Sequence, residues 1–386
     1  MLPVLSAGAC GLLALIAVAA FGLGWFAGSR RHDPADTLRR EQAPFCELAP
    51  LRAPAAAIPA PAPVAMAEPA LHPDRATLGR YRIDRQIGRG SMGTVYLGHD
   101  PQIGRPVAIK TMALSREFEG TELAAARARF FREAEVAGRL KHPDIVTIFD
   151  ASEEQGLAFI AMEYVKGHDL LRHTLPGTLL PVAEVLRTLA RVAQALAHAH
   201  TQGVVHRDVK PANVMIDVES GTVKVTDFGI ARITDACRTR TGLVLGTPSF
   251  MSPEQMAGRR VDGRSDLYSL GVMLFQMLTG ALPHRSESMA QLMNQIANDT
   301  APDVRTLRPE LPEALANVVA LALEKRVEVR YADGSQMAAD LLEVAQMLDA
   351  QALEPPAPDA ADTPGSGGFA ATAEFLRTDP RHNADH

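Results

Sequence analysis

The chain has 386 residues, which is enough for one domain of about 260 residues with extensions on either side. A hydrophobic content of 47% is typical of a folded protein, and a net charge of −6 excludes an overall basic field, so we expect no nucleic acid among its partners. The three cysteines, an odd number, match no zinc-ligand spacing and do not suggest a disulfide framework.

Residues 2–28 contain no charged side chain and are long enough to cross the apolar core of a bilayer, which is roughly 30 Å thick. Trp25 lies near the end of this stretch, where an interfacial aromatic is expected, and Arg30 and Arg31 follow it. No Lys or Arg precedes the stretch, so the positive-inside rule places the residues after it in the cytoplasm. A cleaved signal peptide, the competing interpretation, would have a basic start and a shorter apolar core. We therefore predict a transmembrane anchor at 2–28.

The next segment, residues 29–79, is dominated by alanine and proline, with seven prolines between positions 43 and 70. Such a composition favours extended, polyproline-like conformations and cannot form a packed core. We predict a semi-rigid juxtamembrane linker. A ligand for a proline-binding module is the alternative.

Two β-rich stretches, residues 81–87 and 94–98, flank the glycine-rich sequence GRGSMG at 88–93 and predict a hairpin. Glycines at the turn let backbone N–H groups approach phosphates without a Cβ in the way. The same glycine spacing occurs in dinucleotide-binding folds, where a helix follows it. Here a strand follows, which favours a phosphate-covering hairpin.

Further along, apolar residues at helical spacing predict helices at 122–140 and 182–200, and an amphipathic helix at 335–348. An apolar run at 157–165 lies between the first two. After residue 348 the chain becomes rich in Ala, Pro, Asp and Gly, and we predict a disordered tail at 349–386.

The sequence HRDVKPAN at 206–213 places a carboxylate, a lysine and a carboxamide close together. Pro211 prevents a regular helix there, so the segment is predicted to be a loop that presents polar side chains. Asp208 can accept a proton, Lys210 can neutralise an anion, and the carboxamide oxygen of Asn213 can ligate a hard cation. A second carboxylate follows at Asp227 within the sequence VTDFG.

These segments resemble, in order, the motifs of protein kinases: the glycine-rich loop at 88–95, the strand VAIK that ends at Lys110, the catalytic loop, the Asp-Phe-Gly motif, and SPE at 252–254 where Ala-Pro-Glu is usual. The match extends from Tyr81 to about Arg330 and is most similar to bacterial Hanks-type serine/threonine kinases. The resemblance implies an α+β, bilobal protein-kinase fold over residues 80–348, with a small β-rich N-lobe and a larger helical C-lobe, preceded by the one transmembrane helix.

The resemblance also implies roles for individual residues. Asp208 and Lys210 are the expected catalytic pair, with Lys110 held by an ion pair to Glu133 of the helix at 122–140. Asn213 and Asp227 are expected to bind Mg2+, or Mn2+ in its place. Asp266 is expected to bond the catalytic-loop backbone, Glu254 to pair with Arg330, and Met162 to lie beside the adenine. The expected ATP contacts are Ile87, Gly88, Gly90, Gly93, Val95, Ala108, Lys110, Glu163, Val165 and Asn213.

Thr239 and Thr241 fall in the segment that corresponds to the activation loop, and Arg207 is the expected charge partner of a phosphothreonine there. The sequence thus predicts a kinase of protein Ser/Thr residues, anchored in the bacterial inner membrane and activated by autophosphorylation. The alternative is a membrane-tethered scaffold with a weak or inactive kinase domain. A pseudokinase would lack a catalytic group and a small-molecule kinase would lack the SPE segment. A homodimer is compatible with the sequence.

Overall fold

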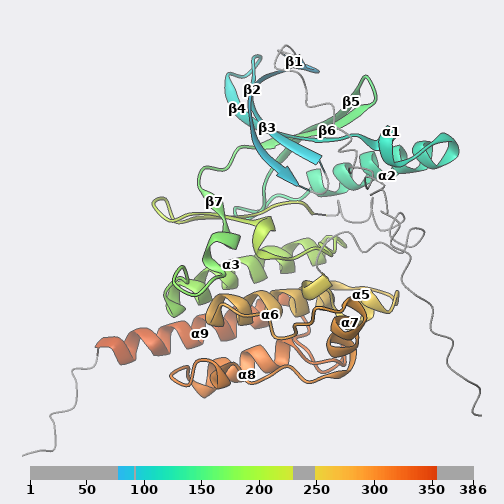
Figure 1. Cartoon of the computed structure of the whole chain (residues 1–386). Helices are drawn as coiled ribbons and strands as arrows, with labels where there is room; N and C mark the ends of the chain where they lie inside the picture. Colours follow the sequence, from blue (N-terminus) through green and yellow to red (C-terminus); the bar gives the residue numbers. More distant parts are fainter. Residues whose placement is uncertain (1–76, 91–92, 229–247, 354–386) are drawn as a thin grey trace, which may run out of the picture. The chain divides into compact units, whose positions relative to one another are not determined.

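The computed structural model describes residues 77–90, 93–228 and 248–353. A six-stranded sheet lies at one end of this region and most of the helices lie at the other, as the bilobal prediction requires (Figure 1). The small lobe is a six-stranded sheet in which every neighbouring pair is antiparallel, in the order β1-β2-β3-β4-β6-β5. Its strands are β1 (Thr77–Leu78), β2 (Tyr81–Gly90), β3 (Gly93–Asp100), β4 (Arg105–Met112), β5 (Ile148–Glu154) and β6 (Leu157–Glu163).

The folded part begins before residue 80, the predicted start of the domain. Thr77 and Leu78 form β1 and pair with Arg82 and Tyr81 through a turn at Gly79, whose φ of +55° suits glycine. Leu78 is fully buried with Tyr81 in the outer core of the sheet. Burial of this leucine explains why β1 precedes residue 80, where composition places the start of the domain.

The predicted hairpin is confirmed as β2 and β3, and two glycines allow its close packing. Gly93 has a φ of +132°, and a Cβ there would lie 1.8 Å from the carbonyl oxygen of Thr111 on β4. A Cβ on Gly98 would lie 2.4 Å from the carbonyl oxygen of Arg82 on β2. These close approaches let β3 pair with β2 on one side and with β4 on the other, and β4 carries Lys110 opposite Val95.

Helix α2 (Gly120–Gly138) covers the face of the sheet opposite the core that contains Leu78 and Tyr81. The single turn α1 (Leu114–Glu117) precedes it. Phe130 and Ala134 of α2 are buried against Ala158 and Ile160 of β6. Burial of a side chain such as Phe130 contributes about 1.5–3 kcal/mol. The same helix carries Glu133, so its packing on the sheet fixes the depth of that carboxylate.

The large lobe is built around α3 (Val182–Thr201), whose predicted apolar face is confirmed. Val185, Leu189, Val192 and Leu196 are fully buried, and α9 and α6 pack against the helix. The other elements are η1 (Leu170–His173), η2 (Pro211–Asn213), η3 (Pro248–Phe250), α5 (Pro253–Met256), α6 (Gly263–Thr279), α7 (Met289–Asn298), η4 (Val304–Thr306), α8 (Glu313–Ala322) and α9 (Gly334–Leu353).

Helix α9 continues to Leu353, beyond its predicted end at residue 348, so the start of the predicted tail is helical. Residues 349–353 are mostly good helix formers, and the next proline is Pro355. Arg187 of α3 also forms an ion pair with Asp349. At its other end α9 begins against α3, since a Cβ on Gly334 would lie 2.2 Å from the carbonyl oxygen of Ala193.

A second, three-stranded sheet lies in the large lobe, with the order β7 (His168–Asp169), β8 (Val214–Asp217) and β9 (Thr222–Val225). The pairing of Val214 with Val225 places Asn213 and Asp227 at the same end of the β8–β9 hairpin. Residues 144–146, which follow α2, are fastened to this hairpin. Val225 donates to the carbonyl of Asp144 (2.8 Å) and accepts from the N–H of Val146 (3.0 Å).

Within the described ranges, no helix has both the length and the apolar character needed to cross a bilayer. The anchor predicted at 2–28 lies outside these ranges, as do the predicted linker up to residue 76 and the predicted tail from residue 354.

Candidate active site

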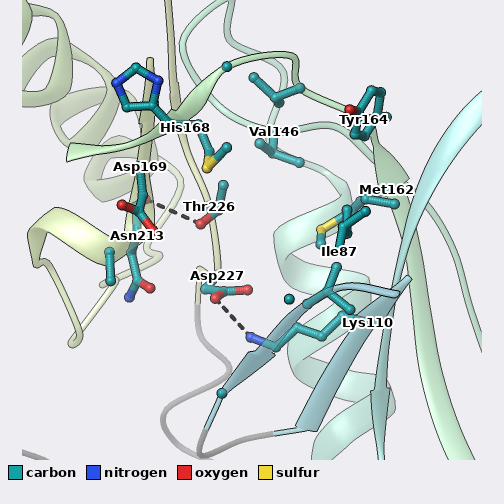
Figure 2. A pocket seen from close by; sticks show the side chains of 18 of the residues that line it. Ile87, Lys110, Val146, Met162, Tyr164, His168, Asp169, Asn213, Thr226 and Asp227 are labelled. Atoms are coloured by element: carbon teal, nitrogen blue, oxygen red, sulfur yellow. Dashed lines mark hydrogen bonds and ion pairs between the residues drawn. The ribbon is translucent and has the colours of Figure 1, made fainter. Parts of the chain in front are cut away.

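A cavity of about 550 Å³ opens between the sheet of the small lobe and the β8–β9 hairpin (Figure 2). Ile87, Val95 and Ala108 line it from the small lobe, as predicted for the adenine contacts. Met162 also lines it, and Met215 of β8 lies on the side of the large lobe. Apolar side chains on both sides form a slot that suits a flat aromatic ring.

The glycine-rich turn borders the same cavity through Gly88, Gly90 and Gly93. Gly88 pairs with Val95, and Gly90 pairs with Gly93 across the turn. Strands β2 and β3 therefore bring Gly88, Gly90 and Gly93 to the edge of the slot, where backbone N–H groups can meet an anion.

The chain passes from β6 to β7 through residues 164–167, and this connection also borders the cavity. Glu163 and Val165, the predicted hinge contacts, both line it. The N–H of Glu163 donates to the carbonyl of Thr147 (2.9 Å), and its carboxylate pairs with Lys224 (2.9 Å). Because the N–H group and the carboxylate of Glu163 are both engaged, its backbone carbonyl is the group that we expect to contact the adenine.

The predicted loop at 206–213 brings its three polar side chains together. Lys210 Nζ lies 2.7 Å from Asp208 Oδ2. The amide nitrogen of Asn213 donates to the backbone carbonyl of Asp208 (2.7 Å) and to its carboxylate (3.0 Å). Since these two bonds fix the amide, the side-chain carbonyl oxygen of Asn213 remains for a cation.

Asp227 forms an ion pair with Lys110, with 2.8 Å between Oδ2 and Nζ (Figure 2). Burial by itself raises the pKa of Asp227, but the charge and hydrogen bond of Lys110 outweigh it and hold the pKa below its usual range. The residue also has a φ of +66°, a strained value outside glycine. A partly exposed carboxylate in a strained backbone conformation, beside a lysine that lowers its pKa, is the kind of group found at functional sites.

Lys110 was predicted to pair with Glu133, and the ion pair described for it is with Asp227. Glu133 is buried on α2 and has interactions of its own, while Lys110 pairs with Asp227. The pair of Lys110 with Glu133 stays a prediction.

Side chains of the large lobe hold the backbone of the catalytic loop. Asp266 accepts from the N–H groups of His206 (2.8 Å) and Arg207 (2.7 Å), which confirms its predicted contact. Arg207 has a φ of +67°, so this contact supports a strained residue directly before Asp208. The ring of His206 donates to the carbonyl of Thr226, next to Asp227 (2.8 Å). The predicted pair of Glu254 and Arg330 is also present.

Residues 81–349 match the protein kinase domain family. The chain belongs to that family. It is 39% identical over 264 residues to the probable serine/threonine-protein kinase PknB of Lactococcus lactis, covering 68% of this chain and 41% of the relative. It is 38% identical over 264 residues to the serine/threonine-protein kinase PrkC of Bacillus subtilis, covering 68% and 40%. The chain thus spans about two fifths of the length of these relatives.

Among solved structures, the PknI kinase domain of Mycobacterium tuberculosis is similar, with a TM-score of 0.56 and 32% identity over 69% of this chain and 97% of that one. The bilobal protein-kinase fold and the resemblance to bacterial Hanks-type serine/threonine kinases are therefore confirmed. Membership of the family implies ATP and a divalent metal as ligands of the kinase domain.

The sequence did not reveal every residue that borders the kinase cavity. Met215 alternates with the buried Val214 and Ile216 in β8, and this pattern could have indicated that it faces the cavity. Asp169 and His168 of β7 carry no such signal. The ring of His168 is hydrogen-bonded to that of His173, with 2.8 Å between the two Nε2 atoms.

Thr239 and Thr241, the predicted phosphorylation sites of the kinase domain, lie outside the described residues. Their expected partner, Arg207, is described. Its Nε atom is buried and has no hydrogen-bond partner in the described part of the chain.

Proposed function

We propose that this protein transfers the γ-phosphoryl group of ATP to serine or threonine hydroxyls of other proteins. The observation that carries the proposal is the convergence of five polar side chains at one cavity. Three come from the catalytic loop, one from β4 and one from the segment after β9. They are Asp208, Lys210, Asn213, Lys110 and Asp227.

The cavity has parts suited to each portion of ATP. The apolar slot between Val95 and Met215 accepts the adenine ring, and the glycine-rich turn lies where the phosphates would pass. The ammonium group of Lys110 supplies a positive charge for the phosphate oxygens. A lysine that now pairs with Asp227 can exchange that partner for phosphate.

The residues also fit a divalent metal. The free carbonyl oxygen of Asn213 and the carboxylate of Asp227 are hard oxygen donors, which Mg2+ prefers and Mn2+ accepts. A metal held there would neutralise charge on the phosphates. The low pKa of Asp227 keeps the carboxylate ionised, as a metal ligand must be.

Asp208 is placed to orient the substrate hydroxyl and to take its proton as the oxygen attacks the γ-phosphorus. The P–O bond to the ADP leaving group breaks as the new P–O bond forms. Lys210 lies beside Asp208 and offsets the negative charge of the transferring group. Positioning and electrostatics therefore supply most of the acceleration.

Serine and threonine are the proposed acceptors for two reasons. Lys210 occupies the position two residues after Asp208 that is lysine in serine/threonine-type kinases. The similar proteins of L. lactis and B. subtilis are also named as serine/threonine-protein kinases.

Activation by autophosphorylation at Thr239 or Thr241 is part of the proposal. The unpartnered Nε of Arg207 supports it, because a phosphothreonine can accept hydrogen bonds from a guanidinium group. Phosphate bound there would act on the strained residue directly before Asp208.

We also propose that residues 2–28 anchor the protein in the bacterial inner membrane, with the kinase domain in the cytoplasm where ATP is available. The support is the uncharged, apolar sequence and the arginines that follow it. Retention of the full-length protein in membranes after alkaline carbonate washing, and its release when residues 2–28 are deleted, would test the anchor.

The first measurement is incubation of the full-length protein with Mg-ATP, followed by mass spectrometry, with Lys110→Met as the inactive control. Phosphate on Thr239 or Thr241 in the wild type alone is the expected result. Phosphate on other residues would support the proposed kinase activity and contradict the proposed activation sites. If neither the protein nor added substrates are phosphorylated, the scaffold interpretation replaces the enzyme.

A further inference from the structure

We propose that Gln255 is a positioning residue that sets the peptide plane directly before Asp208 by holding the carbonyl of Arg207. The inference rests on the proposed kinase function and adds a residue from α5 to its machinery. Gln255 touches neither the cavity nor the reacting atoms, so it acts through the catalytic loop.

Both ends of the Gln255 side chain are engaged. Its carbonyl oxygen Oε1 accepts from the backbone N–H of Ser252 (3.0 Å) and from the Ser252 hydroxyl (3.1 Å). Its amide nitrogen Nε2 donates to the backbone carbonyl of Arg207 (2.9 Å), 48 residues away in the sequence. The side chain therefore links the first residue of the α5 cap to the catalytic loop.

The first of these contacts closes a capping box. Ser252 is fully buried, and its hydroxyl accepts in return from the N–H of Gln255 (3.3 Å). A box of this kind needs only an acceptor at the side chain of its fourth residue, and glutamate serves as well as glutamine. Capping alone therefore does not explain an amide at position 255.

The second contact requires the amide. The donor to the carbonyl of Arg207 is the side-chain N–H of Gln255, and a glutamate side chain that is ionised at neutral pH has no donor. That carbonyl belongs to the same peptide unit as the N–H of Asp208, so the bond fixes the plane in which the backbone of Asp208 begins.

Arg207 is a residue for which such a bond matters. Its φ of +67° is strained for a side chain with a Cβ, and surrounding contacts must hold it. Asp266 of α6 binds the N–H of Arg207 (2.7 Å), and Gln255 of α5 binds its carbonyl. The two side chains together restrain the peptide units on both sides of this residue.

The decisive variant is Gln255→Glu in the full-length protein, because it keeps the acceptor for Ser252 and replaces the donor to Arg207 with an oxygen. We expect kcat to fall about tenfold, the effect of losing one hydrogen bond to a partly buried carbonyl, with KM for ATP unchanged. A fall in kcat without a change in KM separates positioning of Asp208 from general damage to the cavity.

The chain offers a matched control in α7. Ser288 caps this helix by accepting from the N–H of Gln291, the same spacing as Ser252 and Gln255, but no bond joins Gln291 to the catalytic loop. Gln291→Glu should leave kcat and KM at wild-type values. Equal kcat values for Gln255→Glu, Gln291→Glu and wild type would overturn the proposal.

Hydrogen exchange gives a readout that does not depend on activity. Gln255→Glu should speed exchange of the backbone N–H groups at 206–209, and Gln291→Glu should not. If the wild type has no kinase activity, the proposed function fails, but this exchange difference still decides the role of Gln255. If Gln255→Glu does not fold, Gln255→Met removes the donor without adding a charge, and unchanged exchange in that variant rejects the proposal.

Discussion

The guanidinium group of Arg330 donates two hydrogen bonds, of 2.8 and 2.9 Å, to the carboxylate of Glu254, 76 residues away in the sequence. Both side chains are buried in the large lobe. Burial by itself raises the pKa of Glu254, but hydrogen bonds from Arg330 and Ser265 outweigh it and hold the pKa below its usual range. The pair joins the start of α5 to the segment that precedes α9.

Removal of one partner should be more harmful than removal of both. Arg330→Met leaves the Glu254 carboxylate buried without its partner, and we expect the free energy of unfolding to fall by about 3–5 kcal/mol. Urea denaturation of the full-length protein measures this loss. The double variant with Glu254→Gln should recover part of it, and a single variant as stable as the wild type would contradict the expectation.

Asp208 should be required for turnover rather than for folding. Asp208→Asn keeps the shape of the side chain but removes the proton acceptor, so we expect kcat to fall roughly 10²-fold or more. Phosphorylation of added protein substrates with radiolabelled ATP measures the rate. Thermal denaturation should show a folded variant, and near-wild-type turnover would reject Asp208 as the base.

The two ends of the glycine-rich turn should respond differently to alanine. A Cβ on Gly93 would lie 1.8 Å from the carbonyl of Thr111, and its φ of +132° is unfavourable for other residues, so Gly93→Ala should lower the melting temperature. A Cβ on Gly90 meets no atom of the described residues within 4 Å, so Gly90→Ala should melt as the wild type does. Equal melting temperatures for the two variants would contradict this difference.

His284 should make the protein sensitive to acid. Its imidazole is buried and accepts from Lys325 Nζ (3.2 Å). Burial, and then the charge of Lys325, lower the pKa of His284 to about 4. An unfolded chain binds a proton here near pH 6.5, and the folded protein does not until about pH 4. Stability contributed by the neutral imidazole is therefore lost as the pH falls through this window, by up to about 1.4 kcal/mol per pH unit.

The measurement is the melting temperature of wild type and His284→Gln between about pH 7 and pH 4.5. The glutamine variant lacks the titrating group, so its curve should fall less steeply below pH 6.5 than that of the wild type. Parallel curves would show that another group causes the acid sensitivity.

The sequence predicted those parts of the site that depend on local motifs. The loop around Asp208 and the hairpin that carries Gly93 appear where their residues indicate, because proline restricts the backbone locally and glycine permits conformations that other residues avoid. The bond from Asp266 to the loop followed from family resemblance. The position of each motif along the chain, together with the resemblance to protein kinases, was sufficient to predict the loop, the hairpin and this bond.

Other features depend on contacts between distant groups, which no local pattern records. The ion pair of Lys110 with Asp227 joins a strand of the small lobe to the segment after β9, and only the three-dimensional arrangement brings the two residues together. The bond from Gln255 to Arg207 joins two segments far apart in sequence. The end of α9 was missed because helix-forming residues continue past the apolar pattern that marked the helix.

The fastening of residues 144–146 to Val225 has a mechanical consequence. Backbone attachments join the small lobe to the large lobe at the covalent connection 164–167 and at these bonds, alongside side-chain pairs such as Lys224 with Glu163. Sliding or twisting of one lobe against the other would break the bonds at 144–146, so we expect the lobes to open mainly by rotation about the line that joins the two backbone attachments. The distance from Lys110 Nζ to Asp227 would report that rotation.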